Sequence, residues 1–339
     1  MAPANERKLS ANARNLSGHR IMIRSDKLTA RNFPSAQEEV EQQASFETTF
    51  DANPPAAYQL AFTDTDFLVR PELRPVRMQL ELLKPELIQQ ELNIQSTVVI
   101  FGSARIADRE SAQAAVDAAR AAKDEAAVQR AERRLLMSGY YEEARKFARL
   151  VTETTKDFAH PLYVVTGGGP GIMEAGNRGA HEAGGRSIGL NIVLPHEQRP
   201  NQYITPELCF RFHYFGLRKM HFLMRSVALA AFPGGYGTLD ELFETLTLIQ
   251  TGKCRRRPIL LFGRDFWSRL IDFELLIDTG MISPGDEQLF HYVETADEAW
   301  GLLMKEYDIG GATNGTNGTD GVNGTNGHDG TSAVPADGT

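Results

Sequence analysis

Short apolar runs alternate with longer amphipathic stretches through the middle of this chain. The runs have the length and composition of strands that are buried on both faces of a parallel sheet. The stretches between them carry apolar residues at helical spacing. This alternation predicts an α/β fold built on a parallel sheet. The expected strands cover residues 97–101, 162–165, 187–193, 208–212, 227–232 and 258–262.

The amphipathic stretches predict helices, and two of them carry features that bear on packing. Pro85 interrupts the first and should kink or split that helix, because proline lacks the N–H that the helix needs. In a later one, Met220 and Met224 recur with Leu217 and Leu223 at helical spacing, which predicts that they pack in the core. The expected helices cover residues 75–92, 108–136, 140–155, 215–226, 242–249, 266–277 and 296–305.

Composition divides the chain into three parts. Residues 1–75 are polar and lack a sustained period, so we expect a flexible leader with a short helix at 36–46. Residues 76–309 hold the apolar runs and are expected to form one α/β domain, with a helical insertion at about 108–136. Residues 310–339 repeat Asn, Gly and Thr, which is typical of a disordered low-complexity tail.

Charge and cysteine content narrow the class of protein. Hydrophobic residues make up 42% of the 339 residues, and the formal net charge is −8. An acidic chain gives no general reason to expect nucleic acid or an acidic membrane as a partner. No run approaches the roughly 20 apolar residues of a membrane span, and residues 1–24 lack the apolar centre of a secretory signal. Cys209 and Cys254 have no partner at metal-ligand spacing. We therefore expect a cytoplasmic protein with no metal site.

The most informative stretch is 233–241, which reads Pro-Gly-Gly-Tyr-Gly-Thr-Leu-Asp-Glu. It joins an expected strand to an expected helix, so its glycines let the backbone approach a ligand and the helix N-terminus offers N–H groups to an anion. A structural alternative has about even odds on spacing alone, because Thr238 and Glu241 also fit a capping box. Beside a phosphate, a carboxylate is useful when a sugar C1′ becomes an oxocarbenium ion.

Two other glycine turns follow expected strands. Gly102-Ser103 ends the first strand, and Gly-Gly-Gly-Pro-Gly at 167–171 ends the second. Neither fits the dinucleotide fingerprint or a P-loop, and a tight turn is the structural alternative. Together they favour a mononucleotide site, since such turns bind nucleotides in open α/β sheets. Arg218 either belongs to a solvated helix face or points back to the phosphate, and the basic run 255–257 is expected to be a solvated strand entrance.

These motifs together resemble the LONELY GUY family of nucleoside 5′-monophosphate phosphoribohydrolases. That family includes the cytokinin-activating enzymes, and its members were long mislabelled lysine decarboxylases. The resemblance rests on its Pro-Gly-Gly-x-Gly-Thr-x-x-Glu signature at 233–241, the turns at 101–103 and 167–169, and Leu-Arg-Lys-Met at 217–220, and it covers about 97–305. It implies a Rossmann-like, doubly wound parallel sheet with helices on both faces, and a homodimer or higher homo-oligomer.

The resemblance also implies a set of site residues. Arg218 and Glu241 match the family's essential arginine and glutamate. Arg218 is expected to hold the substrate and to keep Glu241 ionised, since a nearby cation lowers the pKa of a carboxyl group. No metal or cofactor is expected. The implied substrate-binding residues are Ser103, Gly168, Gly169, Gly171, Glu174, Lys219, Gly234, Gly235, Gly237 and Thr238.

The chain also departs from the short members of the family. Glu174 stands where they have glycine, and they lack both the insertion at 108–136 and the extension at 1–90. The chain is therefore more similar to the longer bacterial branch, which weakens an expectation of cytokinin specificity and favours AMP or another ordinary nucleotide. The expected reaction is hydrolysis of the N-glycosidic bond to give the free base and ribose 5-phosphate, as in an AMP nucleosidase. Two alternatives remain: a nucleotide or molybdenum-cofactor carrier on the same fold, and a pyridoxal phosphate decarboxylase using Lys219.

Overall fold

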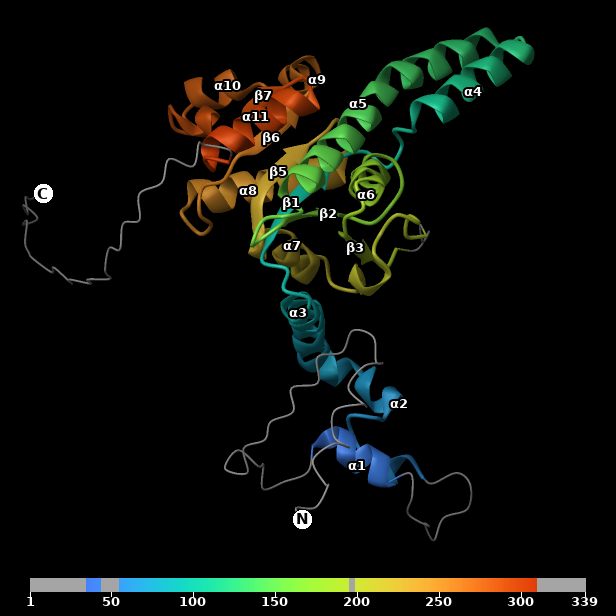
Figure 1. Cartoon of the computed structure of the whole chain (residues 1–339), viewed down its shortest axis with the longest axis vertical. Coiled ribbons are helices and arrows are strands. Elements are labelled where there is room, and N and C mark those ends of the chain that lie inside the picture. Colours follow the sequence, from blue (N-terminus) through green and yellow to red (C-terminus); the bar gives the residue numbers. More distant parts are fainter. Residues whose placement is uncertain (1–34, 44–54, 195–198, 310–339) are drawn as a thin grey trace, which may run out of the picture. The chain divides into compact units, whose positions relative to one another are not determined.

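Seven strands form one parallel sheet in the part of the chain that the structure describes (Figure 1). The structure is a computed structural model and describes residues 35–43, 55–194 and 199–309. The strands lie in the order β4-β3-β2-β1-β5-β6-β7. They are β1 (Ser96–Phe101), β2 (Leu162–Thr166), β3 (Ser187–Ile192), β4 (Cys209–Phe212), β5 (Ser226–Ala231), β6 (Ile259–Phe262) and β7 (His291–Val293).

The order in which the chain adds strands to the sheet reverses at β1. From β1 it adds β2, β3 and β4 on one side, and it then returns to add β5, β6 and β7 on the other. Val99 therefore pairs with Val165 of β2 and with Leu229 of β5. Such a reversal is a topological switch point, where a crevice opens outside the carboxyl ends of the two strands. This places the expected ligand site between the loops that follow β1 and β5.

Helices cover both faces of the sheet, so the predicted doubly wound α/β architecture is confirmed. Each strand was predicted correctly to within two residues at either end except β7, which has only three residues and carries no clear apolar run. The helices are α3 (Arg74–Glu91), α4 (Arg109–Ala121), α5 (Glu125–Thr155), α6 (Ile172–Glu182), α7 (Phe215–Met224), α8 (Tyr236–Gln250), α9 (Arg264–Leu270), α10 (Phe273–Asp278) and α11 (Ala296–Glu306).

The chain divides into two units, Met1–Arg70 and Pro71–Thr339. In the first unit, the described residues include α1 (Ala36–Gln43) and α2 (Thr65–Leu68), and the Asp64 carboxylate caps α2 by accepting from the Phe67 N–H. Much of the predicted leader and all of the predicted tail lie outside the described residues. Within the described segments, no helix combines the length and the apolar character needed to cross a bilayer.

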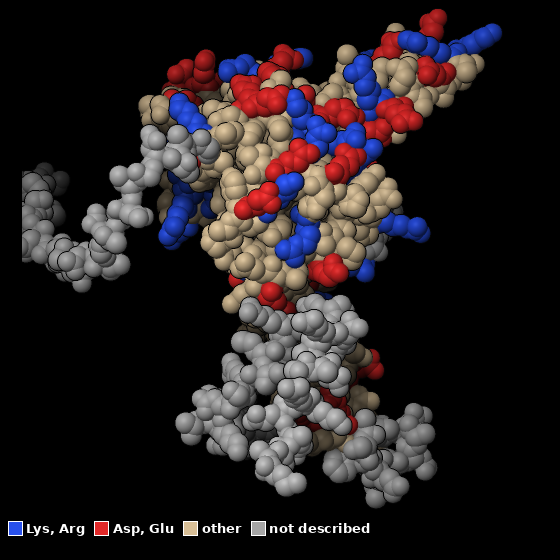
Figure 2. All heavy atoms as spheres, in the orientation of Figure 1, with Lys and Arg blue, Asp and Glu red and all other residues tan. Residues whose placement is uncertain are grey.

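The predicted helical insertion at about 108–136 falls on α4 and the first part of α5, which lie side by side (Figure 1). The expected interruption near 136–140 is wrong, because α5 runs unbroken from Glu125 to Thr155. The break comes earlier, where Lys123 adopts a φ of 55° and the Asp124 carboxylate accepts from the Ala127 N–H at 2.9 Å. Acidic and basic side chains are interspersed over this pair (Figure 2), as expected for a solvated surface.

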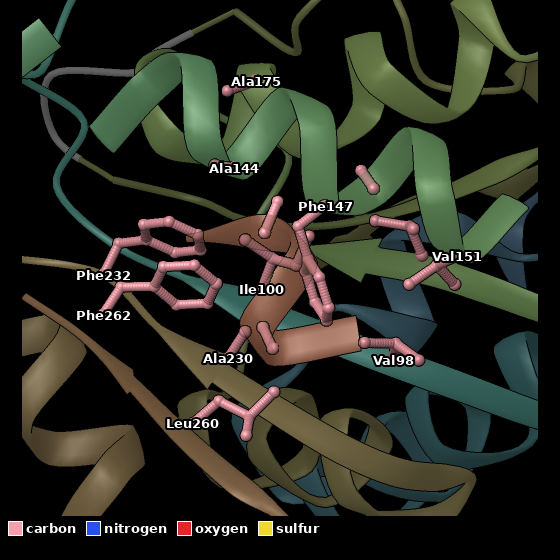
Figure 3. Packing of buried hydrophobic residues seen from close by; sticks show 14 of the residues in the cluster. Val98, Ile100, Ala144, Phe147, Val151, Ala175, Ala230, Phe232, Leu260 and Phe262 are labelled. Carbon is pink, nitrogen blue, oxygen red and sulfur yellow. The ribbon is translucent and has the colours of Figure 1, made fainter. Parts of the chain in front are cut away.

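Each face of the sheet has its own core, because alternate residues of a strand point to opposite faces. On one face Ile100 packs in a cluster with Phe147 of α5 and Phe262 of β6 (Figure 3). On the other face Phe101 packs edge-to-face against Phe222 of α7, with ring centroids 4.8 Å apart. The second core contains residues of both α7 and α8, so these helices lie on the same face of the sheet.

Three helix predictions need correction. Met220 and Met224 are half-exposed rather than buried in the core. Pro85 does not split α3, which continues through it. The helix expected at 266–277 is two helices, because Asp272 caps α10 by accepting from the Leu275 N–H at 2.9 Å.

Candidate active site

A cavity of about 750 Å³ opens at the carboxyl ends of β1 and β5. Its walls come from the loop after β1, the glycine turn after β2, the end of β3, helix α7 and the first two turns of α8. This is the crevice that the switch point of the sheet predicts. The predicted site residues that line it are Ser103, Gly169, Arg218, Gly234, Gly235, Gly237, Thr238 and Glu241.

Main-chain hydrogen bonds join the three loops around the cavity. The Ser103 N–H donates to the Pro233 carbonyl at 3.1 Å, which ties the loop after β1 to the loop after β5. The Ile172 N–H donates to the Ser103 carbonyl at 3.1 Å, which ties the same loop to the turn after β2. Gly171 has a φ of +71°, and a Cβ there would lie 2.4 Å from the Ser103 carbonyl oxygen. Gly171 therefore supports the wall from behind and does not line the cavity.

A buried polar network holds the glycine turn after β2. Asn177 of α6 accepts a hydrogen bond from the Thr166 hydroxyl at 2.7 Å and another from the Asn201 side-chain amide at 2.9 Å. Asn201 also donates to the carbonyls of Gly168 and Gly169, at 3.2 and 3.1 Å. Neither asparagine was predicted from the sequence, because these contacts join segments that are separated along the chain. Gly168 belongs to this network and lies outside the cavity wall.

Helix α8 begins directly at the glycine motif. Its N-cap is Gly235, which makes no side-chain cap, and Tyr236 is its first residue. The capping-box alternative is wrong, because Thr238 lies inside the first turn and its N–H donates to the Gly235 carbonyl at 3.0 Å. A Cβ at Gly234 would lie 2.1 Å from the Thr238 hydroxyl oxygen, so only glycine leaves room for that side chain. The helix N-terminus faces the cavity with N–H groups that have no partner within the helix.

Arg218 reaches the cavity from α7. Its Nε donates to the Leu190 carbonyl at 2.7 Å, and its guanidinium carbon lies 5.1 Å from the centroid of the Phe222 ring. These contacts hold the side chain in one position rather than on a solvated face. The guanidinium also lies against Gly167, where an added Cβ would come within 2.6 Å of Nη2. The first glycine of the turn therefore leaves space for the arginine.

Glu241 lies on α8 and is only 6% exposed. Burial raises the pKa of its carboxyl group to about 7, although Arg218 and Lys219 each lower it. The expectation that Arg218 keeps Glu241 fully ionised is thus wrong. The cation acts in the predicted direction, but the loss of hydration outweighs it. Near neutral pH the carboxyl group is present in both protonation states, which suits a group that gives or takes protons.

Helix α3 holds α7 at both ends. At the N-terminal end, the Glu81 carboxylate accepts from the backbone N–H groups of His213 and Tyr214, at 2.6 and 3.1 Å. At the C-terminal end, Arg225 donates to the Glu86 carboxylate at 2.8 Å. A carboxylate at the start of a helix also interacts favourably with the helix dipole. Because α7 carries Arg218, these contacts help to fix the arginine in the cavity wall.

Two of the predicted substrate-binding side chains point elsewhere. The Glu174 carboxylate accepts from the Tyr141 hydroxyl at 3.0 Å and does not line the cavity. Lys219 forms ion pairs with Asp240 at 2.8 Å and Glu244 at 3.2 Å and lines a different cavity. Whether these side chains contact a substrate stays a prediction. Asp240 does line the cavity, so its ion pair with Lys219 neutralises one negative charge of the cavity wall.

The structure adds wall residues that the sequence did not single out as ligands. Arg105 lies two residues after Ser103 in the loop after β1 and brings a second cation to the wall. Asn191, at the end of β3, donates to the Phe210 carbonyl at 3.1 Å. The rest of the added wall is largely apolar and includes Met173, Ile192, Leu194, Phe215, Tyr236 and Leu270. In the described part of the chain, no group of three or more His, Cys, Asp and Glu residues is arranged to hold a metal.

Comparison with known proteins identifies the family. A protein-family model described as "possible lysine decarboxylase" matches residues 173–303. A probable cytokinin riboside 5′-monophosphate phosphoribohydrolase from Oryza sativa subsp. japonica is 30% identical over 159 residues, which are 44% of this chain and 71% of that protein. The chain belongs to the LONELY GUY family.

Other LONELY GUY proteins match a similar region. A cytokinin riboside 5′-monophosphate phosphoribohydrolase from Arabidopsis thaliana is 33% identical over 150 residues, covering 43% of this chain and 66% of that protein. A second rice protein, with the same probable activity in its name, is 32% identical and is covered over 56% of its length. The chain thus spans less than two thirds of several of the plant relatives it matches.

The solved structures that match are less similar to this chain. A molybdenum cofactor binding protein from Rippkaea orientalis is 16% identical with a TM-score of 0.39, over 63% of this chain and 98% of that one. A molybdenum cofactor carrier protein from Chlamydomonas reinhardtii is 18% identical with a TM-score of 0.39, over 63% and 99%.

Proposed function

We propose that this protein hydrolyses the N-glycosidic bond of a nucleoside 5′-monophosphate, giving the free base and ribose 5-phosphate. The proposal depends on one observation: the same cavity contains a helix N-terminus of the kind that binds phosphate and a buried glutamate. Glu241 lies two turns or less from the N-terminus of α8, so one ligand can contact both. Family membership supports the same reaction, since the plant relatives are named as phosphoribohydrolases.

The phosphate in this proposal binds the N–H groups at the start of α8. Gly234, Gly235 and Gly237 let the backbone approach it, and the helix dipole favours its charge. Arg105, which lines the same cavity, adds a cation on the opposite loop. Binding the phosphate places C1′ of the ribose near Glu241, so remote binding energy orients the bond that breaks.

Glu241 acts on the reacting carbon. As the bond from C1′ to the base nitrogen breaks, positive charge develops on the sugar, and the carboxylate stabilises it. A water oxygen bonds to C1′, one water proton passes to Glu241, and the departing base takes a proton from solvent. A pKa of about 7 matches this general base to neutral pH. Arg218 orients the substrate and moderates the pKa of Glu241.

The substrate we propose is AMP or an N6-modified AMP. Several wall residues are apolar, including Phe215 and Leu270, and they provide surface for a planar base. The cavity volume of about 750 Å³ leaves room beyond the phosphoribose for a purine and a substituent. The plant relatives are named for cytokinin riboside 5′-monophosphates, which supports the N6-modified substrate.

The decarboxylase description of the family model is not supported by Lys219, the nearest candidate for a pyridoxal phosphate lysine. Although burial lowers the pKa of its ammonium group, hydrogen bonds to Asp240 and Glu244 raise it, and the net shift is upward. A Schiff-base lysine must present a neutral amine. A visible absorbance band from bound pyridoxal phosphate in the purified protein would instead support a decarboxylase.

The proposal is tested by incubating the protein with AMP, GMP, CMP, UMP and N6-isopentenyl AMP, and following free base and ribose 5-phosphate by chromatography. We expect release from an adenine monophosphate but not from the matching nucleoside. Glu241→Gln keeps the shape of the side chain and should lower kcat roughly 100- to 10,000-fold. Glu306→Gln, at an exposed position on α11, is the matched control. Nucleotide binding without release of any base would replace the hydrolase with a carrier.

We also propose that the protein forms a homodimer or a higher homo-oligomer. Leu80, Leu83 and Leu87 recur along one side of α3, and each is about half exposed. Apolar stripes of this kind mark interfaces more often than solvated surfaces.

A further inference from the structure

A second cavity, of about 720 Å³, lies at the opposite end of the sheet from the candidate active site. Ser96 and Ser226, the first residues of β1 and β5, line it, whereas the active-site cavity opens where those strands end. Helices α7 and α8 contribute to both cavities. Arg218 faces the candidate active site, and the next residue, Lys219, faces the second cavity.

The walls of the second cavity are strongly basic. The only carboxylate among the described wall residues is Glu244, which is paired with Lys219. A second wall cation, Arg225, is paired with Glu86. Figure 2 shows basic side chains gathered where Figure 1 draws the loop between α8 and β6. The cations in the wall are Lys219, Arg225, Lys253, Arg255, Arg256 and Arg257.

Four of these cations follow one another on that loop and have no acidic partner among the described residues. Arg257 is 9% exposed and donates to the carbonyls of Leu223 and Ser226, at 2.9 and 2.7 Å. Arg256 donates to the Gln288 carbonyl at 2.7 Å. Carbonyls satisfy the N–H groups but leave the charge in place. The expected solvated strand entrance is therefore wrong for Arg257, whose burial holds a positive charge against the cavity.

We propose that this cavity is a second ligand site, which binds a compact anion carrying several phosphate groups. Several unneutralised cations around one concave wall create a positive potential that concentrates multivalent anions. Guanidinium groups match phosphate oxygens in geometry, and three of the four loop cations are arginines. A single carboxylate or phosphate would satisfy only part of this charge, whereas a polyphosphate chain spans it.

The site is linked to the candidate active site through Lys219. Lys219 lines the second cavity, and its ammonium group pairs with Asp240, a wall residue of the first. An anion in the second cavity competes with Asp240 for this cation. When Lys219 turns to the anion, Asp240 is left as an unpaired negative charge beside the proposed phosphate site. Binding of the polyphosphate should therefore weaken binding of the nucleotide.

The test is calorimetric titration of the full chain with sodium tripolyphosphate. The double variant Lys253→Ala/Arg255→Ala removes two exposed wall cations whose side chains form no hydrogen bond or ion pair with the described residues. We expect it to bind tripolyphosphate about tenfold more weakly or worse, since each charge-assisted contact contributes that order of affinity. The control Arg130→Ala/Arg134→Ala makes the same change in net charge at exposed positions of α5. It should bind like the parent protein.

The possible results separate cleanly. Loss of affinity in the loop variant alone supports the proposed site. Equal affinity in the loop variant and the parent would assign any bound anion to the active-site cavity and overturn the proposal, as would an absence of binding by the parent. Circular dichroism and the melting temperature check that both variants remain folded.

The link through Lys219 has a separate test, which rests on the proposed function. Tripolyphosphate should raise the KM for the nucleotide in the parent protein, and the loop variant should lose most of this inhibition. Undiminished inhibition in the loop variant would show that tripolyphosphate competes at the active site, and the link would be wrong. If no nucleotide is hydrolysed at all, the proposed reaction fails, but the calorimetric result stands on its own.

Discussion

Glu241 combines deep burial with two nearby cations, and the balance between them sets its ionisation. Its pKa rises from 4.5 to about 7, because the loss of hydration exceeds the attraction of Arg218 and Lys219. The folded protein therefore holds this proton more tightly than the unfolded chain does. The stability that the group contributes is fully present below about pH 4.5 and is lost as the pH rises through about 7.

The first prediction follows from this direction of the pH dependence of stability. Glu241→Gln cannot ionise, so its free energy of unfolding relative to the parent should be higher at pH 8 than at pH 5. A shift of this size corresponds to roughly 3 kcal/mol at most. Urea unfolding of both proteins at the two pH values measures the change. A stability difference that is the same at both pH values would contradict the raised pKa.

The second prediction concerns Gly167. Replacing it with alanine pushes a methyl group against the Arg218 guanidinium and the Met173 sulfur, so both side chains must move within the cavity wall. We expect kcat/KM for the nucleotide to fall roughly 10- to 100-fold, as is typical of small displacements at a reacting centre. Gly301→Ala on α11 has open space around its added methyl and serves as the control. Equal activity in the two variants would refute the role of Gly167.

At the level of residues, the sequence predicted what a continuous motif can carry. Arg218, Glu241 and the glycines of 233–241 lie close together along the chain, and the wall of one cavity contains them. Asn177 and Asn201 could not be predicted, because the folded sheet alone brings them under the glycine turn. The ionisation of Glu241 also depends on burial, which a sequence does not give.

At the level of elements, α3 does not line the candidate active site but holds the helix that carries Arg218. Glu81 accepts from two N–H groups at the start of α7, and Glu86 pairs with Arg225 at its end. The family-model match at 173–303 does not include α3. An element outside that region thus holds the helix that carries Arg218.

The third prediction tests this arrangement. Glu81→Gln should weaken the hold on the start of α7, destabilising the protein by about 1 kcal/mol and lowering kcat/KM. Glu91→Gln removes the same charge from an exposed position on α3 and should change neither quantity. Thermal unfolding and nucleotide hydrolysis are the measurements. If activity in Glu81→Gln matches that in Glu91→Gln, α3 does not position the arginine.

Helices and strands could be predicted where the local sequence pattern alone determines them. The apolar runs gave six of the seven strands, because strands buried on both faces need continuous apolar sequence. Helix interruptions were misplaced where a side-chain cap decides them, as at Asp124 and Asp272. An aspartate can cap a helix or sit on its surface, and the neighbouring packing determines which.

At the level of the whole molecule, the apolar stripe on α3 bears on assembly. The fourth prediction is that the parent protein is larger than a monomer by light scattering, and that Leu83→Glu shifts it towards the monomer because a buried charge opposes association. Leu136→Glu changes a leucine that is 80% exposed on α5 and is the control. A monomeric parent protein would contradict the proposed homo-oligomer.

The general architecture was accessible from the sequence, but the placement of the second cavity was not. Alternating runs and helices predict a parallel sheet, and the glycine turns indicate which end of it binds ligand. The basic loop reads as a solvated strand entrance until the fold buries Arg257 against the carbonyls of Leu223 and Ser226. The methionines of α7 were misassigned for a related reason: Met220 and Met224 line that second cavity instead of a core.

The main-chain bonds that join Ser103 to Pro233 and to Ile172 have a consequence for how this site can change. No side chain takes part in either bond, so substitutions at positions other than the closely packed glycines leave the frame of the cavity intact. Wall residues such as Phe215 and Leu270 can therefore be exchanged to fit a different base while the phosphate position stays fixed. Such a scaffold lends itself to directed evolution of substrate preference without prior stabilisation.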